Sequence, residues 1–229
     1  MNKKTINKVG IFIDGTFFLK INSYYRYHHS RKSTLNFKGL FNFIAYKIAE
    51  FEGVEKRYVR ICELHWFRGR YSTNQLEKKY TDADYRLTQM NNERRIDDIF
   101  MYEGLIPHNY PLLVDSKTCD AEEKGIDIWL SLETFDIARR SNLETVVIIA
   151  GDSCYVPLIK KLISIDCKVA VLGWDFSYEV KLNTGQKYSV TTRTSQSLLE
   201  ECIYPILMDD IINNNSASDA DYINNLFNV

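Results

Sequence analysis

The sequence predicts an α/β fold built on a central, mainly parallel β-sheet. Two short runs, residues 9–13 and 146–150, are almost wholly apolar and rich in β-branched side chains, which is typical of strands that are buried on both faces. Each run is followed by an Asp that adjoins a Gly and then by a helical pattern. This succession favours parallel strands whose carboxyl ends share one edge of a sheet.

The N-terminal half is expected to supply two strands, two helices and an insertion. The strand at 9–13 leads into a helix at 17–25, and apolar residues at helical spacing predict a second helix over 37–51. Alternation over 58–64 predicts the second strand. Residues 72–102 are polar and are expected to form a helical insertion.

The remaining elements follow from periodicity and from the positions of Gly and Pro. Pro107 and Pro111 restrict any strand over 104–114 to an edge of the sheet or to a short piece. A helical pattern of apolar residues begins at Asp127. After the strand at 146–150, the predicted elements are a helix at 155–165, a strand at 168–172, a β-hairpin over 178–193 around Gly185, a helix near 195–202 and a strand near Ile206.

The domain organisation is expected to be one domain and a tail. Residues 1–212 would form the domain, with a core at about 9–175 and the helical insertion at about 72–102. Residues 213–229 are rich in Asn and Asp and contain no Lys or Arg, which predicts a polar tail that is flexible or lightly docked.

Composition limits the functional classes. Of 229 residues, 45% are hydrophobic and 26% charged, as is ordinary for a soluble domain, and the net charge of -1 means that a polyanion would need a local basic face. The five Cys are scattered without a C-x-x-C pair, which argues against structural zinc and favours a reducing compartment. With no secretory or membrane-spanning pattern, we expect a cytoplasmic protein.

Three Asp residues lie where chemistry is expected. Asp14 and Asp152 follow the two buried strands, and Asp127 begins a helix. Ligands of open α/β sheets bind beyond the carboxyl ends of the strands, and a carboxylate there suits metal or phosphate chemistry. Each Asp could instead merely cap its helix, since Asp is a favoured N-cap residue. Three such acids together favour the functional interpretation.

The segments around these acids resemble the NYN domain, the LabA-like branch of the PIN-like nucleases. The matching motifs are F-I-D-G at 12–15, K-G-I-D at 124–127 and G-D-S-C-Y-V-P-L at 151–158. The resemblance implies a Rossmann-like, three-layer PIN-like fold. It also implies a site that binds Mg²⁺ or Mn²⁺ and hydrolyses phosphodiesters, usually of RNA. Asp14, Asp127 and Asp152 would then be the metal ligands and catalytic acids. Oxygen donors of this kind suit Mg²⁺.

Two positions depart from the family pattern. Cys154 replaces a usual Asp, and Phe17 stands where many relatives have Asn. A thiol is a poor ligand for Mg²⁺, so the site could be weakened or inactive, and the alternative function is an RNA-binding or regulatory module. Cys154 could instead be a reactive thiol at a helix N-terminus. Val156 excludes a nucleophile elbow, which needs Gly there, and Lys160 excludes a phosphatase-type Cys-x5-Arg loop.

A second resemblance, to the D-x-D-G-T motif of haloacid-dehalogenase-like phosphatases, fails. Phe12 stands where that motif has its nucleophilic Asp, and Val156 replaces a later Asp. A phosphatase of that class is therefore not expected.

Several residues are candidates for nucleic-acid contact. Aromatic residues alternate with cations after the first helix, and a second such cluster follows the second predicted strand, where rings can stack on bases and cations can pair with phosphates. The candidate partners are RNA and single-stranded DNA, and a homodimer is a further hypothesis because such nucleases often build their substrate groove between subunits. The candidate contact residues are Arg26, Arg31, Lys32, Arg68, Arg70, Lys124 and Ser153.

Overall fold

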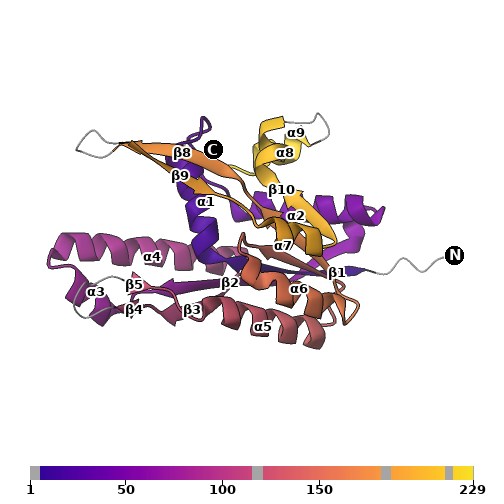
Figure 1. Cartoon of the computed structure of the whole chain (residues 1–229), viewed down its shortest axis with the longest axis horizontal. Coiled ribbons are helices and arrows are strands. Elements are labelled where there is room, and N and C mark those ends of the chain that lie inside the picture. Colours follow the sequence, from indigo (N-terminus) through magenta and orange to yellow (C-terminus); the bar gives the residue numbers. More distant parts are fainter. Residues whose placement is uncertain (1–5, 115–120, 182–186, 215–218, 229) are drawn as a thin grey trace.

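A computed structural model describes residues 6–114, 121–181, 187–214 and 219–228. Within these residues the central sheet has six strands in the order β10-β7-β6-β1-β2-β3, and every neighbouring pair is parallel, which confirms the predicted fold class (Figure 1). The strands are β1 (Asn7–Asp14), β2 (Val59–Arg70), β3 (Ile106–Pro111), β6 (Thr145–Ile149), β7 (Lys168–Gly173) and β10 (Tyr204–Leu207).

Helices cover both faces of the sheet and make three layers. Alternate residues of the strands enter two separate apolar cores, as expected of strands that are buried on both sides. One core contains side chains from α1 (Gly15–Tyr27), α2 (Phe37–Glu52), α4 (Ala83–Glu103), α8 (Met208–Asn214) and α9 (Ala220–Asn225). The other contains side chains from α5 (Ile126–Arg140), α6 (Val156–Ile163) and α7 (Gln196–Glu201).

Two excursions leave the three-layer body (Figure 1). The antiparallel hairpin of β8 (Phe176–Lys181) and β9 (Lys187–Thr192) runs along α1, as predicted, although Gly185 lies outside the described residues. The predicted helical insertion is α4 together with α3 (Thr73–Lys79). A short pair, β4 (Leu113–Val114) and β5 (Ala121–Glu122), lies beside it, and the remaining elements are the 3-10 turns η1 (Lys56–Tyr58) and η2 (Ser153–Tyr155).

Local sequence explains where the helices begin and end. The side chain of Asn36 accepts a hydrogen bond from Gly39 N and so caps α2, which ends at Gly53 in the left-handed region with φ 61°. Asp82 caps α4 in the same way, and that helix also ends at a left-handed glycine, Gly104. These signals place the helices where the sequence predicted them.

All four Pro residues occupy positions that tolerate a missing N–H. Pro107 and Pro111 lie in β3 and Pro205 lies in β10, and these two strands form the edges of the sheet. Pro157 is in the first turn of α6, where the N–H has no helical partner. The predicted restriction of residues 104–114 to an edge strand is confirmed.

The described part of the C-terminal segment, residues 219–228, is docked on the domain. Ile223 and Leu226 are fully buried, and Phe227 forms a bridge with Leu35. The backbone N of Asn228 donates to Thr34 O at 2.9 Å. The apolar residues recur at helical spacing in this Asn-rich segment, which allows α9 to pack against α2.

Among the described residues, no helix combines the length and apolar character required of a membrane span.

Candidate functional site

The three predicted acids lie at the carboxyl edge of the sheet. Asp14 is the last residue of β1, and Asp152 follows the end of β6, which is the neighbour of β1. Asp127 is in the first turn of α5. Asp14 Oδ1 accepts a hydrogen bond from Phe17 N at 3.0 Å, and Asp152 Oδ1 accepts one from Cys154 N at 2.8 Å. Two of the acids therefore do cap the turns that follow them, without this excluding a second role.

Tyr155 joins two of the acids. Its hydroxyl is 3.3 Å from Asp14 Oδ2 and 3.0 Å from Asp127 Oδ1, and its ring is fully buried. One hydroxyl proton is thus shared between two carboxylates. This contact fixes the side chains of Asp14 and Asp127 toward one another. Asp152 is outside this network and instead shares a hollow with Asp14.

That hollow, here called the acidic hollow, has a volume of about 300 Å³ and opens at the ends of β1 and β6. Its walls come from α1, from the loop after β6, from the segment before α5 and from the foot of the β8–β9 hairpin. It is lined by Asp14, Thr16, Phe17, Lys20, Glu123, Gly151, Asp152, Thr191, Thr192 and Arg193.

Glu123 is an acid of the site that the sequence reasoning missed. Its Oε1 accepts hydrogen bonds from Thr16 Oγ1 at 2.7 Å and from the backbone N of Gly69. These bonds carry the carboxylate from the loop before α5 to the ends of β1 and β2. The available signal was an acid directly before the K-G-I-D segment, in a loop already expected near the site.

The carboxylates in and beside the acidic hollow repel one another. Burial and, to a lesser extent, the carboxylates of Glu123 and Asp127 raise the pKa of Asp14 from an ordinary value of 3.8 to about 6, although the hydrogen bonds from Phe17 N and Tyr155 act to lower it. Within the described part of the chain, none of Asp14, Glu123, Asp127 and Asp152 forms an ion pair. A ligand with positive charge would relieve this repulsion.

Cys154 does not have the properties of a reactive thiol. Partial burial of the thiol, followed by the charges of Asp127, Asp152 and Asp14, raises its pKa to about 12. The thiol is therefore protonated at neutral pH, and the nucleophile alternative loses its physical basis. Cys154 stands beside the acids as a neutral side chain in place of a carboxylate.

Phe17 forms a wall of the site. The ring is 8% exposed and packs edge-on to Trp174 with centroids 6.4 Å apart. A Cβ at position 151 would lie 2.7 Å from this ring, so the Gly of the G-D-S motif leaves the space that the ring fills. The departure from the family's usual Asn thus exchanges a polar brace for apolar packing.

The second basic cluster lies elsewhere than predicted. Residues 66–70 belong to β2 instead of following it. Arg68 is 7% exposed and is paired with Glu93 of α4, while Arg70 Nη1 lies 3.0 Å from Asp97 Oδ1. The predicted cluster is therefore part of the strand and does not lie beyond its end, and both guanidinium groups are paired with carboxylates of α4.

The other predicted contact residues fall into two groups. Arg26, Arg31 and Lys32 lie at the far end of α1, where Arg26 stacks on Tyr27 and Arg31 on Phe227. The 13-residue helix separates them from Asp14 by about 18 Å, at about 1.5 Å per residue. Lys124 and Ser153 are exposed and are sequence neighbours of acids in the site. Two cations that were not predicted, Lys20 and Arg193, line the acidic hollow itself.

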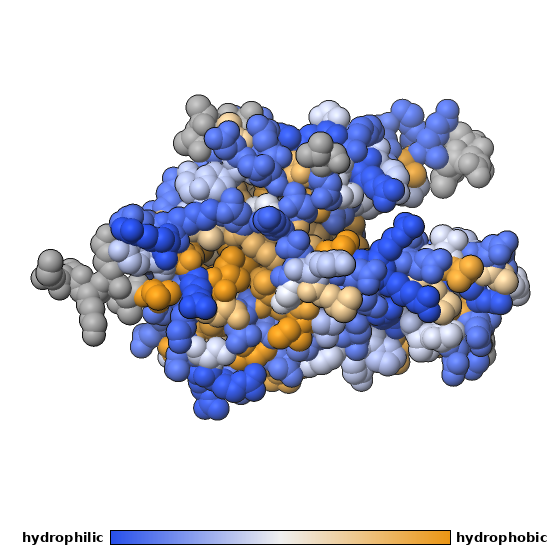
Figure 2. Space-filling view, turned by 180° about the vertical axis from the view of Figure 1, so that it is seen from behind, coloured by the Kyte–Doolittle hydropathy of each residue, from blue (hydrophilic) through white to orange (hydrophobic). Residues whose placement is uncertain are grey.

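A larger cavity lies away from these acids. It has a volume of about 490 Å³, lies between α1, α2 and α4, and is lined by apolar rings that include Phe18, Phe37 and Trp66. Hydrophobic side chains gather over the middle of the molecule on the side opposite to Figure 1 (Figure 2). None of the four carboxylates enters this cavity, so we place the candidate site at the acidic hollow.

The donor set of the acidic hollow suits a hard divalent cation. All of its candidate ligands are carboxylate oxygens, which Mg²⁺ and Mn²⁺ prefer, and Mg²⁺ usually takes only one or two carboxylates and keeps several waters. Among the described residues, however, no group of three or more His, Cys, Asp and Glu side chains is already arranged to hold an ion. The predicted three-ligand set of Asp14, Asp127 and Asp152 therefore stays a prediction.

Comparison with known proteins agrees with this fold. The chain is similar to a protein of unknown function, VPA0982, from Vibrio parahaemolyticus, with 16% sequence identity and a TM-score of 0.51, over 92% of this chain and 98% of that protein. This likeness concerns the fold alone. No curated protein matches. The profile of the NYN domain matches residues 8–202. The chain therefore belongs to the NYN domain family, within the PIN-like nuclease superfamily.

Proposed function

We propose that this protein is a metal-dependent nuclease that hydrolyses phosphodiester bonds, with RNA as its substrate. The observation that supports this most directly is the acidic hollow at the carboxyl ends of β1 and β6, which is lined by the carboxylates of Asp14, Glu123 and Asp152. Asp127 lies beside it and is joined to Asp14 through the hydroxyl of Tyr155. Lys20 and Arg193 stand at the wall of the hollow and suit a phosphodiester. The carboxylates alone would repel a phosphodiester. A divalent ion bound to them would remove this repulsion, and the two cations could then bind the phosphate.

Asp14 and Asp152 would hold Mg²⁺ or Mn²⁺, assisted by Asp127. When bound, such an ion supplies a more acidic water and neutralises charge on the attacked phosphate. Tyr155 holds Asp14 and Asp127 in orientation through its shared hydroxyl. Glu123, fixed by Thr16 and the Gly69 amide, adds a carboxylate to the same hollow. It compensates in charge for the Asp that Cys154 replaces.

A second candidate is an inactive NYN-type module that binds RNA. Cys154 favours it, because this neutral thiol beside the acids offers Mg²⁺ no oxygen donor. Both candidates have the same fold and the same cations, Lys20 and Arg193, at the acidic hollow. They differ in whether the remaining carboxylates hold a metal ion well enough for hydrolysis.

Cleavage of labelled RNA and single-stranded DNA in Mg²⁺ and in Mn²⁺ separates them. We would compare the natural chain, Cys154→Asp and the double variant Cys154→Asp, Asp152→Asn. Cleavage by the natural chain and by Cys154→Asp, lost in the double variant, supports the nuclease. Cleavage by Cys154→Asp alone identifies a disarmed nuclease. RNA binding without cleavage by any of the three would refute the enzyme and leave the binding module.

A further inference from the structure

Arg193 occupies an unusual position at the foot of the β8–β9 hairpin. It is the first residue after β9, its side chain is exposed, and it has no ion-pair or hydrogen-bond partner among the residues that the structure describes. It lines the acidic hollow together with Thr191 and Thr192. A cation held at an acidic site without a protein partner is available to an anionic ligand.

Arg193 also lines a second hollow at the hairpin foot. This hollow, here called the hydroxyl hollow, has a volume of about 620 Å³ and shares Thr191, Thr192 and Arg193 with the acidic hollow. Ser177 and Gln196 add neutral polar groups to its lining. The two hollows therefore adjoin along the foot of the hairpin, with Arg193 between them.

The chemistry of the hydroxyl hollow suits a sugar-phosphate backbone. Hydroxyl, amide and guanidinium groups are the common partners of phosphate and sugar oxygens. Asp175 is the acid of its lining, and its Oδ1 accepts a hydrogen bond from Thr194 N at 2.7 Å. That carboxylate is engaged in holding the backbone beside Arg193. An apolar ligand would find little to contact here.

The foot of the hairpin is held against the catalytic edge. Ser195 N donates to Gly151 O at 2.8 Å, which ties the segment after Arg193 to the residue before Asp152. On the hairpin's first strand, Phe176 stacks on Tyr24 of α1 with ring centroids 4.2 Å apart. The backbone that carries Arg193 is thus positioned relative to the acids before any substrate binds.

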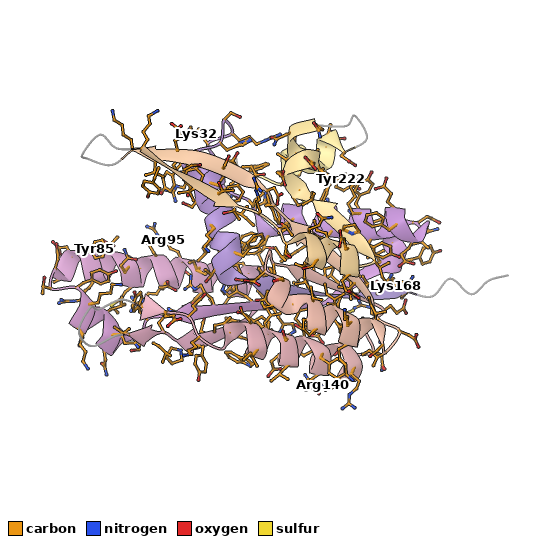
Figure 3. The ribbon with its side chains drawn as sticks, in the orientation of Figure 1. Lys32, Tyr85, Arg95, Arg140, Lys168 and Tyr222 are labelled. Atoms are coloured by element: carbon orange, nitrogen blue, oxygen red, sulfur yellow. The ribbon has the colours of Figure 1, made fainter. Side chains whose placement is uncertain are left out.

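Among the described residues, the side of the molecule formed by α4 offers fewer unpaired cations to a substrate strand than the hairpin side does. Arg68 and Arg70 are neutralised by Glu93 and Asp97, as described above. Arg95, although exposed, projects from the middle of α4 and does not line the acidic hollow (Figure 3). Of the two cations that line the acidic hollow, Arg193 lies at the foot of the hairpin and Lys20 lies on α1, and neither comes from α4.

We propose that Arg193 binds the backbone phosphate next to the one attacked, and that the substrate strand leaves the acidic hollow across the hairpin foot into the hydroxyl hollow. The inference rests on the proposed nuclease function and deepens it. It assigns a substrate that continues beyond the scissile phosphate, a nucleic-acid strand rather than a mononucleotide. Lys20 of α1, on the wall of the same hollow, would contact the attacked phosphate or its neighbour.

The test compares Arg193→Gln and Arg193→Lys with a remote control, Arg140→Gln. Arg140 points away from the body at the end of α5, where its Nη1 lies 3.5 Å from Asp136 Oδ2 (Figure 3). Cleavage of a single-stranded RNA gives kcat and KM. Binding of the same RNA, followed by fluorescence anisotropy in the Asp152→Asn background over a range of salt, gives the dependence of affinity on salt.

Arg193→Gln is expected to raise KM about tenfold, the effect of one lost charge-assisted hydrogen bond, with a smaller change in kcat. The slope of log affinity against log salt concentration is negative, and it should become less steep by about 0.7, which corresponds to the loss of one phosphate contact on a single strand. Arg193→Lys should keep the slope and recover part of the affinity. A merely structural role would alter stability and leave the salt slope unchanged.

The proposal is overturned if Arg193→Gln matches Arg140→Gln in KM and in salt slope while the natural chain cuts RNA. If the natural chain binds RNA but does not cut it, the nuclease function fails, and the salt slope still decides the role of Arg193. If it neither binds nor cuts RNA, both proposals fall.

Discussion

Asp14→Asn is expected to stabilise the protein in the absence of metal, because the native carboxylate is destabilised by its site. The buried position and the nearby charges of Glu123 and Asp127 raise the pKa of Asp14 from 3.8 to about 6. At about 1.4 kcal/mol per pKa unit, ionised Asp14 costs the folded state about 3 kcal/mol at pH values well above 6. Asn keeps the helix cap, since its side-chain oxygen can accept from Phe17 N.

The sign of the pH dependence follows from linkage. A pKa that is raised on folding contributes stability that is fully present below about pH 3.8 and is lost as the pH rises through about 6. The advantage of Asp14→Asn should therefore be absent near pH 3.5, grow between pH 4 and 7 and then level off. Allowing for the weaker hydrogen bond to Tyr155, we expect about 1–3 kcal/mol at pH 7.5.

Urea denaturation in EDTA at pH 3.5, 5.5 and 7.5 measures this difference. Asp136→Asn is the matched control, because Asp136 is exposed on α5, and its change should stay within about 0.5 kcal/mol. A destabilised Asp14→Asn at pH 7.5, or a gain of equal size at all three pH values, would refute the electrostatic reasoning. Millimolar Mn²⁺ should stabilise the natural chain and leave Asp14→Asn nearly unaffected.

Three further predictions concern other parts of the molecule. Tyr155→Phe should weaken Mn²⁺ binding about 10- to 100-fold by releasing Asp14 and Asp127, as calorimetry would show, and unchanged affinity would contradict the orienting role. Phe227→Ala should cost about 3–5 kcal/mol in urea denaturation, because the ring is 7% exposed, and an unchanged midpoint would mean that the C-terminal segment is not docked. Burial lowers the pKa of His65 and of His108, and His65 Nδ1 lies 2.9 Å from His108 Nε2. The free energy of unfolding should therefore contain a component that falls as the pH drops below about 6.5. This component should be smaller in His108→Gln. Equal slopes of unfolding free energy against pH in the two proteins would exclude the His pair as its source.

Much of the fold could be predicted from the sequence because the pattern is local. The runs at 9–13 and 146–150 are apolar on both faces, and only a covered parallel sheet accommodates such strands. The carboxyl ends of parallel strands meet at one edge, so the positions of Asp14 and Asp152 followed directly. The hairpin and the edge strand were likewise marked by alternation and by Pro.

What could not be predicted depends on distant contacts. Glu123 reaches the site only because Thr16 and the Gly69 amide hold its carboxylate, and neither is a sequence neighbour. Arg68 appears exposed in the sequence, but α4 covers it and supplies Glu93. Arg193 adjoins the acids because Ser195 N binds Gly151 O, a contact that no local pattern marks.

The distribution of Pro has a consequence for self-association. Of the four Pro residues, three lie on the two edge strands, at 107 and 111 on one side and at 205 on the other. An edge strand normally offers a row of N–H and C=O groups to any passing strand, and Pro interrupts that row. Neither edge of this sheet is therefore suited to adding a strand from a second copy. The six-stranded sheet should therefore resist growth into a continuous intermolecular sheet in crowded solutions.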